Sequence, residues 1–112
     1  MAYDDALAAR IRELLAGERG VTEKKMFGGL AFLVHGNMAV AASGKGGLLV
    51  RVDPDESDAL VRKSGVALME MGGRSMTGWL TVEAAAVQTK KQLAEWVDRG
   101  VGFARTLPPK RL

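Results

Sequence analysis

Two short apolar runs, Leu30–Val34 and Met38–Ala42, limit most strongly what this chain can fold into. Runs of this length, bounded by turn residues, are typical of β-strands. Gly36-Asn37 lies between them and suits a two-residue hairpin turn with glycine at the first central position, because such turns need positive φ. A charged and glycine-rich segment precedes the hairpin and consists of Lys24, Lys25, Met26, Phe27, Gly28 and Gly29.

The same kind of pattern predicts further strands along the chain. Leu48–Val52 divides its side chains between two faces and is expected to complete a three-stranded meander. Val66–Met71 and Trp79–Glu83 are predicted to form a second pair, and the loop between them, residues 72–78, is long for a hairpin. Val21–Met26 is extended but poorly patterned, so a short edge strand and an irregular entry both remain open.

Three helices are predicted from their capping residues. Asp4 can accept hydrogen bonds from the free amides of a helix over residues 4–16. Asp53 followed by Pro54 is a strong start for a second helix, since proline at the first helical position loses no hydrogen bond. Thr89 and Gln92 have capping-box spacing and begin the last helix. The buried stripe of that helix is expected to be Leu93, Trp96, Val97, Val101 and Ala104.

The order of these elements predicts an α+β fold of the type α-β-β-β-α-β-β-α, with helices packed on an antiparallel sheet. A chain of 112 residues is expected to form one domain, residues 1–112. The composition, 47% hydrophobic and 26% charged, is that of an ordinary globular protein. No apolar run approaches the ~20 residues that span a bilayer, so no membrane association is expected. A cytoplasmic location fits the absence of cysteine.

Several short motifs follow one another along the chain: Lys24 to Gly29, Gly36-Asn37-Met38, Leu48 to Arg51, Gly73 to Met76, and Trp96 to Leu107 with the following Pro-Pro-Lys. In this order they resemble the N-terminal domain of the TfoX/Sxy family of bacterial competence regulators. The resemblance implies a fold similar to that of secretion chaperones. It also implies a connection with transcription, since full-length members activate transcription of DNA-uptake genes together with the cyclic-AMP receptor protein. Those members carry a second, helical domain, which a chain ending at Leu112 is expected to lack.

The segment before the hairpin offers one candidate contact surface. Lys24 and Lys25 could bind phosphates, but lysines also protect an exposed sheet edge from pairing with other chains. Phe27 could be a binding platform, and the alternative that we favour is a core residue beside Gly28 and Gly29, which would supply positive φ or a close approach.

Arg74 is the strongest single candidate for a ligand contact. An arginine in a mobile glycine-rich loop can clamp a phosphate or a carboxylate with two parallel hydrogen bonds, and the alternative is a solvated loop residue. Lys90 and Lys91 open the basic C-terminal part of the chain, which continues into the tail residues Lys110 and Arg111. Together with Lys24, Lys25 and Arg74, these cations could form a nucleic-acid-binding face.

Signals for catalysis are weak. His35 is the only histidine, and the flanks of Ser43 and Ser75 do not resemble those of a nucleophile. One histidine without any cysteine makes a metal site improbable, and no cofactor is expected. A small enzyme or ligand sensor, with Arg74, Ser75 and His35 around a pocket, is therefore the third hypothesis.

The preferred hypothesis is a non-enzymatic cytoplasmic interaction module, connected with transcription and acting through protein partners or its own dimer. The unpaired edge expected near residues 22–26 would suit strand addition. Direct nucleic-acid binding ranks second. What discriminates the two is whether the candidate cations share one face of the molecule.

Overall fold

The computed structural model describes residues 3–26 and 28–109 of the chain. Its α-helices are α1 (Asp5–Leu14), α2 (Ser57–Leu60) and α3 (Lys90–Thr106), and two 3-10 turns are η1 (Pro54–Glu56) and η2 (Ala84–Val87). Its strands are β1 (Val21–Met26), β2 (Gly29–Val34), β3 (Asn37–Ala42), β4 (Leu48–Arg51), β5 (Val66–Met71) and β6 (Arg74–Val82).

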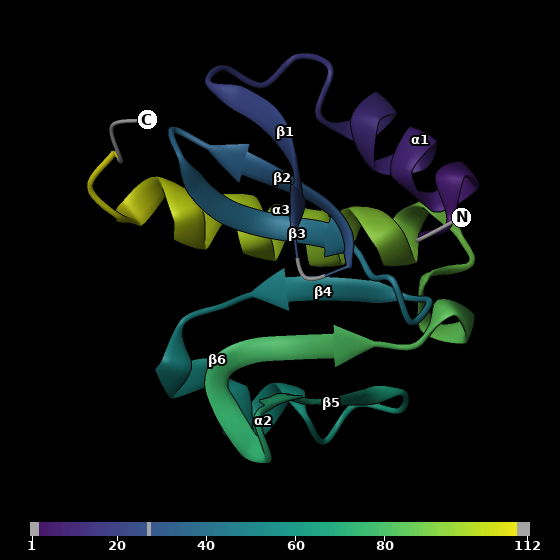
Figure 1. The fold of residues 1–112 in the computed structure, drawn as a ribbon, viewed down its shortest axis with the longest axis vertical. Helices are drawn as coiled ribbons and strands as arrows, with labels where there is room; N and C mark the ends of the chain where they lie inside the picture. The colour runs from purple at the N-terminus through teal and green to yellow at the C-terminus, as the bar shows by residue number, and fades with distance from the viewer. Residues whose placement is uncertain (1–2, 27, 110–112) are drawn as a thin grey trace.

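All six strands join one antiparallel sheet in the order β1-β2-β3-β4-β6-β5, which confirms the α+β prediction. The order along the chain has one strand more than the predicted α-β-β-β-α-β-β-α, because Val21–Met26 is an edge strand rather than an irregular entry. The second edge of the sheet is β5. Figure 1 shows α3 passing behind β3, so the viewer looks onto the face of the sheet opposite to α3.

Local capping predictions are confirmed. The carboxylate of Asp4 accepts hydrogen bonds from two amides at the start of α1. Asp53 caps η1, and Pro54 is the first residue of this turn. Thr89 and Gln92 form the complete capping box of α3. The second helix is shorter than predicted, since only α2 follows the 3-10 turn η1.

The main core lies between the sheet and the helices α1 and α3. Its fully buried members include Ile11 of α1, Phe32 and Val50 of the sheet, and Leu93 of α3. Gly100 lets α3 lie directly on β3, because a Cβ atom at this position would be 2.4 Å from the carbonyl oxygen of Ala39. The predicted stripe of α3 is therefore confirmed, and its glycine marks where helix and sheet come closest.

The β2–β3 hairpin turns one residue earlier than predicted. Val34 pairs with Asn37, so the two central residues are His35 and Gly36 and not Gly36-Asn37. Both have positive φ, 49° for His35 and 83° for Gly36, as in a type I′ turn. Asn37 is instead the buried first residue of β3, and its side-chain amide donates a hydrogen bond to the carbonyl of Pro108.

Arg74 does not lie in a long mobile loop. The β5–β6 connection is only Gly72-Gly73, since Met71 pairs with Arg74, the first residue of β6. Two consecutive glycines with positive φ allow this tight turn. The remaining loop residues belong to a bend in β6, visible in Figure 1, where the pairing with β5 shifts between Leu68 and Met69.

Among the described residues, no helix is both long and apolar enough to cross a membrane.

Candidate interaction surfaces of the sheet

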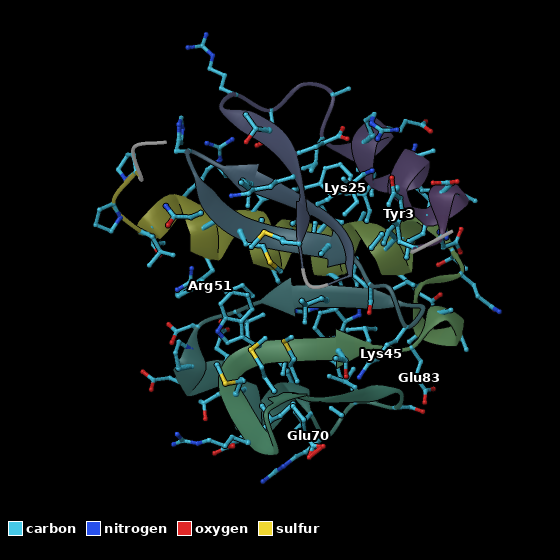
Figure 2. The ribbon with its side chains drawn as sticks, in the orientation of Figure 1. Tyr3, Lys25, Lys45, Arg51, Glu70 and Glu83 are labelled. Atoms are coloured by element: carbon cyan, nitrogen blue, oxygen red, sulfur yellow. The ribbon has the colours of Figure 1, made fainter. Side chains whose placement is uncertain are left out.

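The sheet face opposite to α1 and α3, here called the open face, carries a second apolar cluster. Within the described part of the chain, this cluster contains only strand residues. Its buried members are Ala31, Leu33, Met38, Ala41 and Leu49, and the partly buried Met26, Met69 and Trp79 pack against them. In Figure 2, methionine sulfur atoms lie over β3 and β6 on the side of the viewer. A sheet covered by helices on one side usually shows polar residues on the other, so this apolar face needs an explanation.

A cavity of about 340 Å³ opens on this face. Every strand of the sheet contributes to its wall, including both edge strands. Met26 of β1 and Met69 of β5 line the same cavity although four strands separate them in the sheet order, so the sheet must curl toward the open face. The volume lies at the lower end of the range of ligand pockets, roughly 300–1,000 Å³.

The wall of the cavity is mostly apolar, and its polar side chains belong to exposed residues and to the half-buried Ser43. Ala41 and Leu49 are buried in the wall, whereas Lys45 and Glu70 are exposed lining residues from the β3–β4 turn and from β5. Such a wall excludes water from an apolar group but offers few converging polar atoms to orient a small polar ligand.

An arginine with two aromatic neighbours lies at the end of β4. The guanidinium carbon of Arg51 is 4.9 Å from the ring centre of Trp79 and 5.6 Å from that of Phe103. Figure 2 labels Arg51 at this end of the strand. Cation–π contacts of this geometry hold the arginine between sheet and helix α3.

The free backbone groups of the edge strands follow from the pairing of their inner neighbours. His35 N–H donates to the carbonyl of Gly20, the residue before β1. Because the bonding direction alternates along a strand, Val21, Glu23 and Lys25 direct their amides away from β2. At the other edge, Glu83 N–H donates to the carbonyl of Gly65. By the same alternation, three residues of β5 direct their N–H and C=O groups away from β6, namely Val66, Leu68 and Glu70. The N–H of Val66 already donates to the carbonyl of Lys63, so Val66 offers only its carbonyl to another strand.

The β1 edge is charged and partly engaged by α1. Lys24 pairs with Ala31 of the open face, while Lys25 pairs with Leu30 of the main core, so the two lysines point to opposite faces. Glu23 receives two hydrogen bonds from the Arg12 guanidinium, at 2.7 and 2.8 Å. This hydrogen-bonded charge pair lowers the pKa of Glu23 below its usual value.

The β5 edge is apolar over most of its length. Its sequence, Val66 to Met71, contains Glu70 as its single charged residue. Met71 is 42% exposed and is the large hydrophobic side chain that protrudes into solvent among the described residues. Figure 2 labels one residue of each edge strand, Lys25 in the upper half and Glu70 near the bottom of the view.

The structure does not bring the predicted contact residues together. Arg74 lies at the tip of the β5–β6 hairpin, and Lys90 and Lys91 are exposed in the first turn of α3. Lys24 and Lys25 lie at the opposite edge of the sheet. Phe27 falls outside the described residues, as do Lys110 and Arg111; Gly28, with positive φ, follows Phe27 directly.

Gly29 was predicted as a structural residue beside Gly28. A Cβ atom at Gly29 would lie 2.1 Å from the carbonyl oxygen of Ala42, so β2 and β3 can pair here only with glycine. The predicted role of a close backbone approach is confirmed for Gly29.

The residues proposed for a small catalytic pocket are also separated. His35 lies in the β2–β3 turn, with its ring against Gly20, whereas Arg74 and Ser75 begin β6. Strands β3 and β4 intervene in the sheet order, and the cavity on the open face is lined by other residues.

Sequence reasoning missed the open face, although one signal was present. The runs Leu30–Val34 and Met38–Ala42 do not alternate between apolar and polar residues, and both strands are buried at every position. Uninterrupted apolar strands are typical of sheets covered on both faces. The sequence thus contained a sign of a second apolar face, but not of its shape.

Comparison with known families gives one result. A family model described as the TfoX N-terminal domain matches residues 13–104. No curated protein and no solved structure gives a match.

Proposed function

This chain belongs to the TfoX N-terminal domain family, and we propose that it is a non-enzymatic interaction module acting in the cytoplasm. It acts through protein partners or its own dimer, in a process connected with transcription. The observation that carries this proposal is the open face, where a cavity with a mostly apolar wall opens beside a buried cluster that contains no helical residue among those described.

Two features of the sheet support a protein as the ligand. The open face is concave and apolar, with methionines at its border, and soft methionine side chains adapt to differently shaped partners. Both edge strands have outward N–H and C=O groups, which can accept an additional strand. A partner that adds a strand at either edge would also extend the open face.

The distribution of positive charge supports this proposal over direct nucleic-acid binding. A basic face needs its cations on one surface, because phosphates follow each other along the nucleic-acid backbone. Lys24 and Lys25 point to opposite faces of the sheet, and Lys90 lies on the helical layer. The scattered positions of His35, Arg74 and Ser75 likewise favour binding over catalysis.

The test combines sedimentation with capture of partners. The wild-type protein is sedimented with and without a labelled random-sequence DNA duplex at low and moderate salt. In parallel, it serves as bait in an extract of its host beside two charged variants. Thr81→Lys places a lysine on the exposed part of the open face. Asp98→Lys places a lysine on the solvent side of α3 as a control, with a change in net charge that is one unit larger.

We expect the wild-type protein and Asp98→Lys to retain the same partner or the same self-association, and Thr81→Lys to lose it. DNA should not co-sediment. A strictly monomeric protein that captures nothing would overturn the proposal. Salt-sensitive co-sedimentation with DNA would replace it by nucleic-acid binding, since release of counterions makes phosphate contacts weaken steeply with salt.

A further inference from the structure

We infer that the partner at the β5 edge is a second copy of this chain. Two β5 strands pair antiparallel across a two-fold axis and join two six-stranded sheets into one. This inference rests on the proposed function, of which it specifies the self-association and its site.

The two edges of the sheet differ in the features that permit strand pairing. Lysines on an edge strand oppose pairing with another chain, and β1 carries two consecutive lysines, Lys24 and Lys25, one on each face of the sheet. Glu23, one of the outward-directed residues of β1, is also bonded to Arg12 of α1. Strand β5 has no lysine or arginine, and two of its three outward-directed residues are Val66 and Leu68. The β5 edge therefore lacks the protection that β1 has.

The charges around β5 favour an antiparallel arrangement with its own copy. Arg62 and Lys63 lie in the turn before the strand, separated from Val66 by Ser64 and Gly65, while Glu70 lies near the end of the strand. Antiparallel pairing places the end of each strand beside the start of the other, so Glu70 of one copy approaches the cations of the second copy. Parallel pairing would place like charges together.

The outward backbone groups select the register. A two-fold axis at Leu68 pairs Leu68 with itself and Val66 with Glu70 of the second copy. Both backbone groups of Leu68 then find partners, and the N–H of Glu70 meets the carbonyl of Val66, whose own N–H stays bonded to the carbonyl of Lys63. An axis at Glu70 would instead place the two carboxylates opposite each other. The register centred on Leu68 therefore keeps the two Glu70 carboxylates apart while the backbone groups of Leu68 and the N–H of Glu70 find partners.

The same register covers the exposed apolar side chains of the edge. Ala67, Met69 and Met71 lie on the open face, which becomes continuous between the two copies. Ala67 stands opposite Met69 of the second copy, and the exposed Met71 stands opposite its Gly65. Dimerisation thus removes from water the hydrophobic side chain that protrudes most among the described residues.

A matched pair of proline variants tests the site. Glu70→Pro removes an outward N–H without loss of any bond to β6, since proline is tolerated where the amide faces solvent. Lys25→Pro makes the same change at the outward-directed position of β1. We expect the wild-type protein to show a monomer–dimer equilibrium in sedimentation velocity. Glu70→Pro should weaken the dimer by at least about tenfold, and Lys25→Pro should leave it unchanged.

A second measurement does not depend on proline. The chain has no cysteine, so Leu68→Cys introduces a single thiol at the proposed axis. Directly opposite residues of a hydrogen-bonded pair have Cα atoms about 5.5 Å apart, within disulfide range. Oxidation of Leu68→Cys should give a covalent dimer at native pH, whereas Lys25→Cys should stay mainly monomeric.

Each outcome decides between the two proposals. A wild-type protein that remains monomeric over a roughly hundredfold range of concentration overturns the dimer but leaves a protein partner open. A dimer weakened by Lys25→Pro, or cross-linked through Lys25→Cys instead of Leu68→Cys, places the interface at β1 and refutes the β5 edge. A monomer that also captures no partner refutes both proposals.

Discussion

Replacement of Gly100 by alanine should destabilise the protein, although alanine is the better helix former. The Cβ atom would lie 2.4 Å from the carbonyl oxygen of Ala39, which is about 1 Å short of ordinary contact. Both atoms belong to rigid elements, so α3 must move away from β3. Overpacking of this kind costs about 1–3 kcal/mol, and the helix gains about 1 kcal/mol from the alanine. With the cost at its upper end, the net loss is about 2 kcal/mol.

Gly102→Ala is the matched control in the same helix. Its Cβ would meet no atom within 4 Å, so only the helix-forming gain of about 1 kcal/mol remains. Both substitutions reduce the entropy of the unfolded chain equally, so their difference of about 3 kcal/mol reports the contact with β3. Urea unfolding followed by circular dichroism measures the free energy of unfolding, and melting temperatures should differ by roughly 12 °C.

The result that would refute this reasoning is equal stability of the two variants. Gly100→Ala would then fit without displacement of the helix, and α3 could not lie as close to β3 as the structure places it.

Three further substitutions test local contacts. The Arg12 hydrogen bond lowers the pKa of Glu23 in the folded state, so its stabilisation is present above the usual value near 4.5 and is lost as the pH falls through the lowered value. Between pH 7 and pH 3, the melting temperature of Glu23→Gln should therefore fall less than that of the wild-type protein. Thr89→Ala removes the cap of α3 and should cost about 1 kcal/mol in urea unfolding. Asn37→Ala deprives the carbonyl of Pro108 of its donor and should cost about 1–2 kcal/mol, measured in the same way.

The sequence predicted most accurately the structural features that depend on residues close together in the chain. Asp4 and Thr89 bond to amides two or three positions ahead, so their capping roles follow from spacing alone. The apolar stripe of α3 and the runs of β2 and β3 likewise express a local period. These features are sufficient to establish the fold class.

What the sequence did not predict depends on contacts across the molecule. Arg74 was placed in a loop because Gly72 to Gly78 reads as one flexible segment. The structure divides it into a tight turn and a bend, and the bend is held by Gly78, whose amide donates to Ser57 and whose carbonyl accepts from Val52. Neither partner is near in sequence, so no local pattern could show that β6 continues through this stretch.

The directions of the Lys24 and Lys25 side chains also depended on a contact that no local pattern shows. Neighbouring residues of a strand always point to opposite faces, so the pair could serve one surface only if Val21–Met26 were irregular. Its pairing with β2 shows that Val21–Met26 is a strand, so Lys24 and Lys25 cannot form one contact surface.

The two faces of the sheet have different requirements. The face under α1 and α3 must be apolar for the chain to fold, and its glycine at position 100 shows how closely it is packed. The open face needs no helix contact, so polar residues there would have left that core intact. Yet Leu33, Met38 and Leu49 occupy it and are buried beneath the curl of the sheet, while a cavity remains beside them and Met71 is exposed on the β5 edge. The open cavity and the exposed methionine, rather than the buried cluster itself, are what support the protein partner that we propose for this face.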